Sequence, residues 1–223
     1  MYDALKNRIN LMIVQANSRT IPRRPEELLD VDPELWDVLG TLEAMHARGE
    51  FHDASKLLLQ TLPENVIFDD PWVANALGLS LSQGGDEQEA WPFFLRSEQL
   101  GLAMARSAAT PQGRQVGLKR AACAANNLAV SLKKVCRYSE ALQVAERAVE
   151  HAPWFWPGYT ALVAVLEGRN APGDREQVLD MLRRMFDACP GAVDNPDVLG
   201  ALRHDADYAA LRVDARFADL VPV

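Results

Sequence analysis

The sequence has few cysteines and no long hydrophobic run. Its three cysteines, Cys123, Cys136 and Cys189, are an odd number and match no zinc or redox spacing. A disulfide framework needs cysteine pairs and an oxidising compartment, so we expect reduced thiols and a cytoplasmic protein. No segment approaches the roughly 18 uninterrupted apolar residues of a membrane span. The run from Leu11 to Val14 is too short for a signal-peptide core, so we expect neither export nor a membrane partner.

Motifs that carry chemistry are also missing. The sequence has no glycine-rich phosphate loop, no His-Glu-x-x-His, no Gly-x-Ser-x-Gly, no Cys-x-x-Cys and no EF-hand spacing. His46 and His52 straddle a predicted turn without a third ligand, and His204 stands beside aspartates, so we interpret all three as surface residues. We therefore expect no metal site, no cofactor and no enzymatic activity.

Adjacent carboxylates occur at two places, Glu26-Glu27 and Asp69-Asp70. Paired carboxylates are a requirement of some acid–base catalysts. Both pairs, however, lie where helices are expected to begin, and acidic residues there interact favourably with the helix dipole. We therefore assign them a structural role.

Positive charge is in short supply as well. Acidic residues number 31 and basic residues 23, which gives a net charge of −8, so we expect no nucleic-acid partner. Hydrophobic residues make up 48% and charged residues 24% of the chain. This balance is typical of a folded globular protein and excludes disorder over most of the chain.

The regular feature that is present is a repeat. Residues 126–153 combine small residues at helical spacing, an aromatic residue near a turn and a proline that closes the second helix. The positions that carry this pattern are Leu128, Ala129, Leu132, Tyr138, Ala141, Ala145, Ala148 and Pro153. The segment resembles the tetratricopeptide repeat, a two-helix motif of about 34 residues.

The same pattern fits upstream and downstream. Ala90 follows Ala54 by 36 residues, and Ala141 follows Ala90 by 51, so one interval is too long. We place the excess in residues 101–117, as an insertion with a loop at Thr110 to Gly113 and flanking helices that are extended by a turn or two. In the upstream unit we expect the second helix to begin near Glu89, which puts Pro92 in its first turn.

The resemblance implies an all-α fold, a right-handed superhelical solenoid of about four helical hairpins. We expect an amphipathic helix and a proline-containing linker in residues 1–31, repeats in residues 32–190 and capping helices in residues 191–223. The hairpins are predicted at residues 33–66, 71–100, 118–153 and 156–190.

The resemblance also predicts a partner-binding groove on the concave face. It places there Asn75, Leu79 and Ser82 of one hairpin and Asn126, Val130, Lys133 and Lys134 of another. Residues 111–150 carry a net charge of +4, which favours a protein or peptide partner with an acidic segment. The pattern partly resembles the carboxylate clamp of some family members, although Leu39 and Glu43 stand where the clamp has Lys and Asn. A solvated basic face, a clamp and a groove for an acidic or extended segment all remain open.

The tryptophans and the apolar N-terminal residues each allow more than one structural role. We expect Trp36, Trp72 and Trp91 in the core. In the Trp154-Phe155-Trp156 run at least one ring should be half exposed, either as a binding anchor or packed on the next helix. The apolar face of the first helix is either a cap on the repeats or an oligomer contact; its residues are Leu5, Ile9, Met12 and Ile13.

The function that these features favour is a non-enzymatic interaction module or chaperone-like adaptor that binds a peptide or partner helix. One alternative is a self-assembling scaffold protein that forms a homo-oligomer through its N-terminal helix. The other is an enzyme with an unrecognised motif.

Overall fold

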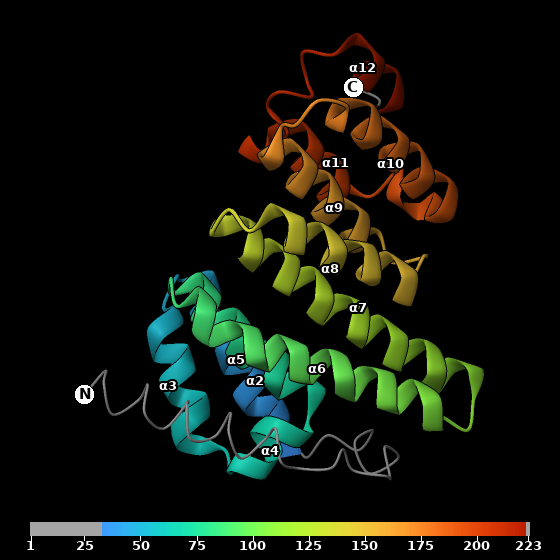
Figure 1. The fold of residues 1–223 in the computed structure, drawn as a ribbon. Coiled ribbons are helices and arrows are strands. Elements are labelled where there is room, and N and C mark those ends of the chain that lie inside the picture. Colours follow the sequence, from blue (N-terminus) through green and yellow to red (C-terminus); the bar gives the residue numbers. More distant parts are fainter. Residues whose placement is uncertain (1–32, 222–223) are drawn as a thin grey trace. The chain divides into compact units, whose positions relative to one another are not determined.

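The structure is a computed structural model that describes residues 33–221. Within this range it contains eleven α-helices, two short 3-10 helices and no strand (Figure 1). The prediction of an all-α fold of helical hairpins is therefore confirmed. The chain divides into two compact units, Met1–Ala124 and Ala125–Val223, and each is described by itself. Helix α7 contributes residues 111–124 to the first unit and residues 125–134 to the second.

The first unit is built on the hairpin of α5 and α6. Helix α3 packs on α5, α2 packs on α3, and the short α4 touches α3, α5 and α6. Its core contains the fully buried side chains of Leu58, Ile67, Leu77, Phe93 and Phe94. The helices are α2 (Pro33–Ala47), α3 (Phe51–Thr61), α4 (Glu64–Asp69), α5 (Pro71–Gln83), α6 (Glu87–Ser107) and α7 (Pro111–Lys134).

The second unit is built around α9, which packs against both α8 and α10. Helix α9 is apolar on nearly every side, with all positions from Gly158 to Leu166 buried except Thr160, as expected for a central helix. Helix α12 packs on α10, as predicted for a cap. The elements are α8 (Tyr138–His151), α9 (Trp156–Arg169), α10 (Asp174–Ala188), η2 (Pro190–Ala192), α11 (Pro196–His204), η3 (Ala206–Tyr208) and α12 (Ala215–Leu220).

Three hairpins share one turn of three residues. Its second residue has a positive φ, which is 74° at Gly49, 92° at Gly85 and 59° at Cys136. The N–H of its third residue donates to a carbonyl five residues earlier: Glu50 to Met45 at 2.9 Å, Asp86 to Leu81 at 2.9 Å, and Arg137 to Leu132 at 3.0 Å. This bond is typical of a helix that ends in a left-handed residue.

The fourth residue of the second helix in each of these hairpins is a fully buried alanine. These alanines are Ala54, Ala90 and Ala141, the residues from which the repeat spacing was measured. The predicted turns and crossing residues of these three hairpins are therefore confirmed.

The extra length of the long interval lies in helix. Helix α6 runs to Ser107 and α7 begins at Pro111, so the predicted extension of both helices is confirmed. The loop predicted at Thr110 to Gly113 is wrong: residues 108–110 form it, because the Thr110 hydroxyl accepts the N–H of Gly113 at 3.0 Å and α7 starts at Pro111. The two helices touch through backbone. A Cβ atom added to Gly101 would lie 2.6 Å from the nitrogen of Ala121, and one added to Gly117 would lie 2.5 Å from the nitrogen of Ala105.

Two features near this hairpin differ from expectation. Helix α6 begins at Glu87, two residues earlier than predicted, because the turn closes at Asp86. Pro92 therefore lies inside the helix, in its second turn, and removes one helical hydrogen bond. Helix α4 was not predicted, since six residues are too few to show a hydrophobic period.

We expect Gly101→Ala and Gly117→Ala each to destabilise the protein. Alanine favours a helix interior over glycine by about 1 kcal/mol. Here, however, the new methyl group meets backbone of the partner helix, and overpacking of this kind costs about 1–3 kcal/mol. Urea unfolding followed by circular dichroism measures the net loss. Gly200→Ala in α11 is the matched control, because an added Cβ meets nothing within 4 Å there, and it should stabilise. Equal effects at all three positions would contradict the close helix contact.

We expect Cys136→Gly to stabilise the protein by about 0.5–1 kcal/mol, because glycine adopts the positive φ of this turn without the Cβ repulsion that cysteine carries. Cys136→Ala keeps that repulsion and should leave stability close to its original value. The midpoints of urea unfolding compare the variants. A glycine variant no more stable than the alanine variant would show that Cys136 is unstrained.

Candidate functional site

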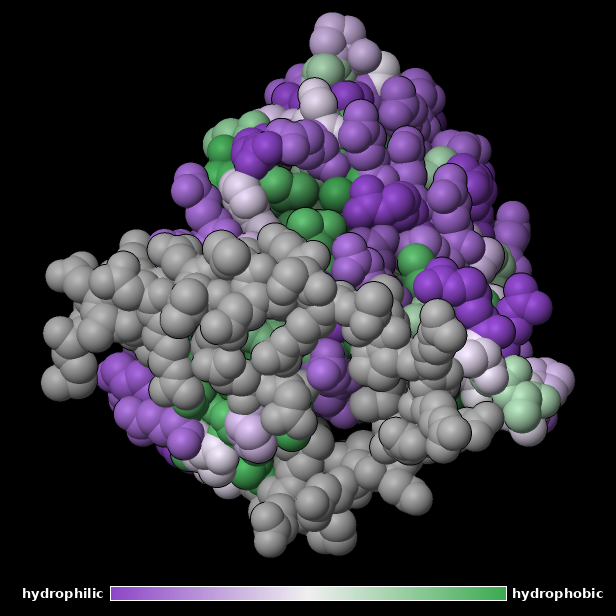
Figure 2. All heavy atoms as spheres, turned by 60° about the horizontal axis from the view of Figure 1, so that its bottom comes forward, coloured by the Kyte–Doolittle hydropathy of each residue, from purple (hydrophilic) through white to green (hydrophobic). Residues whose placement is uncertain are grey.

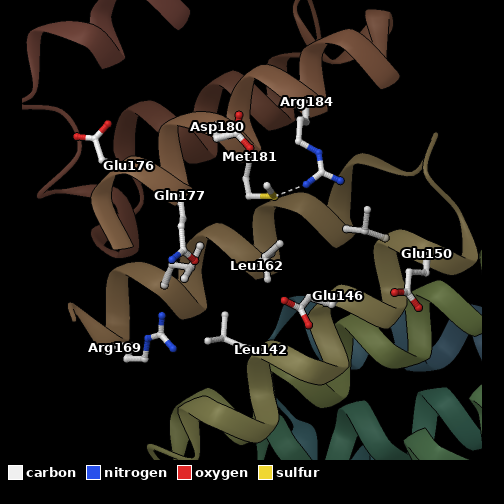
Figure 3. A pocket seen from close by; sticks show the side chains of 12 residues that line it. Leu142, Glu146, Glu150, Leu162, Arg169, Glu176, Gln177, Asp180, Met181 and Arg184 are labelled. Atoms are coloured by element: carbon white, nitrogen blue, oxygen red, sulfur yellow. Dashed lines mark hydrogen bonds between the residues drawn. The ribbon is translucent and has the colours of Figure 1, made fainter. Parts of the chain in front are cut away.

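A hollow in the second unit lies between α8 and α10 and is floored by α9 (Figure 3). We call it the α8–α10 groove. Its volume is about 670 Å³, within the size range of ligand sites in proteins. The residues that line it are Leu142, Glu146, Val149, Glu150, Leu162, Leu166, Arg169, Glu176, Gln177, Asp180, Met181 and Arg184.

The floor of the groove is apolar. Leu162 and Leu166 come from α9, Leu142 and Val149 from α8, and Met181 from α10. Leu142 and Met181 are only half-buried, so part of this apolar surface meets solvent. A methionine on such a floor adapts its shape to different apolar partners.

The α8 wall of the groove is acidic, whereas the α10 wall carries a carboxylate and a guanidinium. Glu146 and Glu150 lie one helical turn apart on α8, and Asp180 faces the groove from α10 (Figure 3). Within residues 33–221, none of these three carboxylates forms an ion pair or a hydrogen bond with another side chain. Arg184 lies on the same wall as Asp180, and its guanidinium donates to the sulfur of Met181 at 3.5 Å. Two carboxylates therefore lie on the α8 side of the apolar strip, and one carboxylate and one guanidinium lie on the α10 side.

One end of the groove is fixed by ion pairs. The Arg169 guanidinium binds the buried carboxylate of Asp174, which also accepts the N–H of Ala171 at 2.8 Å. Its hydrogen bond to Arg169 lowers the pKa of the Asp174 carboxyl. Glu176 accepts from Arg216 of the capping helix α12 at 2.8 Å and 2.9 Å. These acids are neutralised, unlike those on the walls.

The groove residues predicted from the sequence do not line this hollow. Asn75 and Leu79 lie half-buried on α5 in the first unit, whereas Ser82 is buried and its hydroxyl donates to Glu87 at 2.6 Å. The remaining four lie on the part of α7 that belongs to the second unit: Asn126, Val130, Lys133 and Lys134. Asn126 donates to the side chain of Asn127 at 3.1 Å. Their role in binding stays a prediction.

The structure gives the exposure of the tryptophans for which burial or exposure was predicted. Trp72 is 40% exposed instead of buried in the core, because it stands in the first turn of α5, where its ring packs against the Arg120 guanidinium at 4.4 Å. The prediction for Trp72 was therefore wrong. Trp154 is 44% exposed, which confirms that at least one ring of its aromatic run is half exposed. Trp156 is half-buried at the start of α9.

The Asp69-Asp70 pair, considered above for acid–base chemistry, stabilises helix ends and contacts. Asp70 caps α5 and accepts the N–H groups of Trp72 and Val73 at 2.7 Å and 3.0 Å, and Asp69 accepts from Arg96 at 2.9 Å. This confirms the structural role of that pair. The described part of the chain holds no group of three or more His, Cys, Asp or Glu side chains able to bind a metal ion. In the same part, no helix has the length and apolar character needed to cross a membrane.

His46 is half-buried rather than a simple surface residue. Its Nε2 lies 2.8 Å from the hydroxyl of Ser80, and its ring packs against Phe51. Because Ser80 donates its proton to the carbonyl of Ala76, His46 is the donor in their hydrogen bond. His52 and His204 are exposed, as predicted.

Some predicted residues lie outside the described range. Among them are the Glu26-Glu27 pair and the N-terminal oligomer contact made of Leu5, Ile9, Met12 and Ile13. The assignments for these residues stay predictions.

Comparisons with known proteins add little beyond the fold. No family model matches the chain, and no curated protein does. One similar solved structure is "MamA RS-1 ArsTM double mutant", with 19% sequence identity and a TM-score of 0.48. The match covers 85% of this chain and 95% of that chain. Similarity at this level carries no statement about function.

We expect stability to fall as the pH drops from 7 towards 5.5. Burial lowers the pKa of His46 below its usual value of 6.5, so the unfolded chain takes up a proton before the folded chain does. The stabilisation is therefore complete above the unfolded pKa and is lost below it. Urea midpoints at several pH values measure the slope, and His46→Gln should reduce it. His204→Gln, at an exposed position, is the control; an equal reduction there would contradict the assignment to His46.

Proposed function

We propose that this chain is a non-enzymatic protein-interaction module and that the α8–α10 groove binds an amphipathic helix of a protein partner. The observation that supports this most is the apolar floor between unpaired carboxylates on opposite walls. A helix-in-groove contact requires an apolar strip of this kind. Helices pack at about 8–10 Å, so a partner helix that lies on α9 would touch α8 and α10 as well.

The charges of the groove define the chemistry of the partner. Glu146 and Glu150 on the α8 wall favour a helix with Lys or Arg on the border that faces α8. On the α10 wall Asp180, which stands beside Arg184, offers one carboxylate to the other border. Unpaired carboxylates attract such a helix before contact and select against an acidic one. The acidic partner predicted from the α7 residues concerns a different face and stays a separate prediction.

A labelled helical peptide tests this function on the full chain. The probe has about 20 residues, with Leu on one face and Lys on both borders of that face. In a second peptide Glu replaces every Lys. We expect the Lys peptide to bind with a Kd in the micromolar range and the Glu peptide to bind at least about tenfold more weakly. Fluorescence anisotropy measures both affinities.

The Glu146→Lys and Asp180→Lys double variant should weaken binding of the Lys peptide at least about tenfold, since it places repulsive charge on both walls. Asp187→Lys is the matched control, because Asp187 lies exposed on α10 outside the groove. Circular dichroism checks that both variants fold. If the double variant and the control bind the peptide alike, the groove is not the binding site.

A further inference from the structure

We infer that the natural occupant of the α8–α10 groove is the N-terminal segment, residues 1–18, of a second copy of this chain. The inference rests on the proposed helix-binding function of the groove and names its partner. It is argued from the charge and the spacing of that segment in the sequence, set against the floor and the walls of the groove.

The N-terminal segment has the opposite charge to the rest of the chain. Residues 1–18 contain two basic residues, Lys6 and Arg8, and one acidic residue, Asp3, whereas the whole chain has a net charge of −8. Arg19, Arg23 and Arg24 follow in the linker, outside the segment. Within residues 33–221 the groove presents three carboxylates without an ion pair, Glu146, Glu150 and Asp180, against one guanidinium, Arg184, so its charge is opposite to that of the segment.

The spacing of the segment fits the groove as well. At 100° per residue, Leu5, Ile9 and Met12 fall on one helix face, together with Ile13 and Ala16. Lys6 and Arg8 then fall on opposite borders of that face. The groove has a related three-part order, with acidic α8, the apolar floor, and α10 with Asp180 and Arg184 (Figure 3). One basic border of the helix therefore meets Glu146 and Glu150, and the other meets Asp180.

The lengths of the two surfaces also agree. The apolar face from Leu5 to Ala16 spans about 17 Å as an α-helix. The lining positions run from Leu142 to Glu150 on α8 and from Glu176 to Arg184 on α10, and each of these stretches spans about 12 Å. Three turns of the segment thus cover the two turns of each wall.

The sequence between the segment and α2 forms a linker. Pro22 and Pro25 interrupt any helix that starts in the segment. Residues 19–32 reach at most about 50 Å when extended. A contact in which each copy donates one surface and receives another is head-to-tail, so it forms rings or open chains. The assembly should therefore grow with protein concentration.

Photo-crosslinking of the full chain tests the contact directly. A benzophenone amino acid replaces Ile9, and a mixture of isotope-labelled and unlabelled chains identifies crosslinks between two copies by mass spectrometry. We expect inter-chain crosslinks to residues on α8 and α10 that line the groove. Crosslinks confined to one chain, or crosslinks to other surfaces, would overturn the inference.

Reciprocal charge reversal tests it independently by light scattering. Lys6→Glu with Arg8→Glu should reduce the mass to the 24.7 kDa of one chain, and so should Glu146→Lys with Asp180→Lys. All four changes together should restore assembly, which a merely structural effect would not do. Arg114→Glu with Asp187→Lys, two exposed positions outside the groove, is the control and should leave the mass unchanged. A quadruple variant that stays monomeric would contradict the pairing.

The Lys peptide separates failure of this inference from failure of the proposed function. Ile9→Glu with Met12→Glu removes the apolar face of the segment and should free the groove, so the peptide should bind about tenfold more tightly than it binds the unmodified chain. If the peptide binds both chains equally and depends on Glu146, the groove binds helices and the N-terminal segment is not its occupant. If the peptide binds neither chain, the proposed function fails.

Discussion

The backbone hydrogen bond that closes the three-residue turn is the constraint on which the hairpins depend. It joins Glu50 to Met45, Asp86 to Leu81 and Arg137 to Leu132, and each time it requires a residue with positive φ just before the donor. The turn fixes where the second helix begins. Its fourth residue is then an alanine without exposed surface, which lets the paired helices approach closely. The turn hydrogen bond thus determines which residue of the second helix packs against the first helix.

This dependence explains how much of the fold the sequence predicts. Turns and crossing alanines recur at regular spacings in the sequence. The long interval between Ala90 and Ala141 predicts longer helices. The contact between Trp72 and Arg120 was not predictable in this way, because the two residues are 48 positions apart and α7 brings the guanidinium to the ring. Sequence analysis did not predict the α8–α10 groove for the same reason. Its lining residues lie on three helices, between Leu142 and Arg184 in the sequence. Periodicity shows that a helix has an apolar face, but it does not show which part of that face stays uncovered.

The second unit sorts its carboxylates into two groups. Asp174 is paired with Arg169, and Glu176 is paired with Arg216, which also binds Asp214. The hydrogen bond from Arg216 lowers the pKa of Asp214 to about 2, so this acid remains charged under ordinary conditions. Glu146, Glu150 and Asp180 have no such partner in the part of the chain that the structure describes. These three carboxylates lie beside exposed apolar surface, where their charge affects recognition more than stability.

The groove lies where the hairpin pattern changes. The turn between α9 and α10 has four residues instead of three, with positive φ at both Asn170 and Gly173. The fourth residue of α10 is then Gln177, which is exposed and lines the groove, whereas the equivalent alanines of α3, α6 and α8 are fully buried. Val178, one residue later, is the side chain that packs inward. Helix α10 thus presents a different face to its partner than the other second helices do, and Gln177 and Met181 of α10 border the groove.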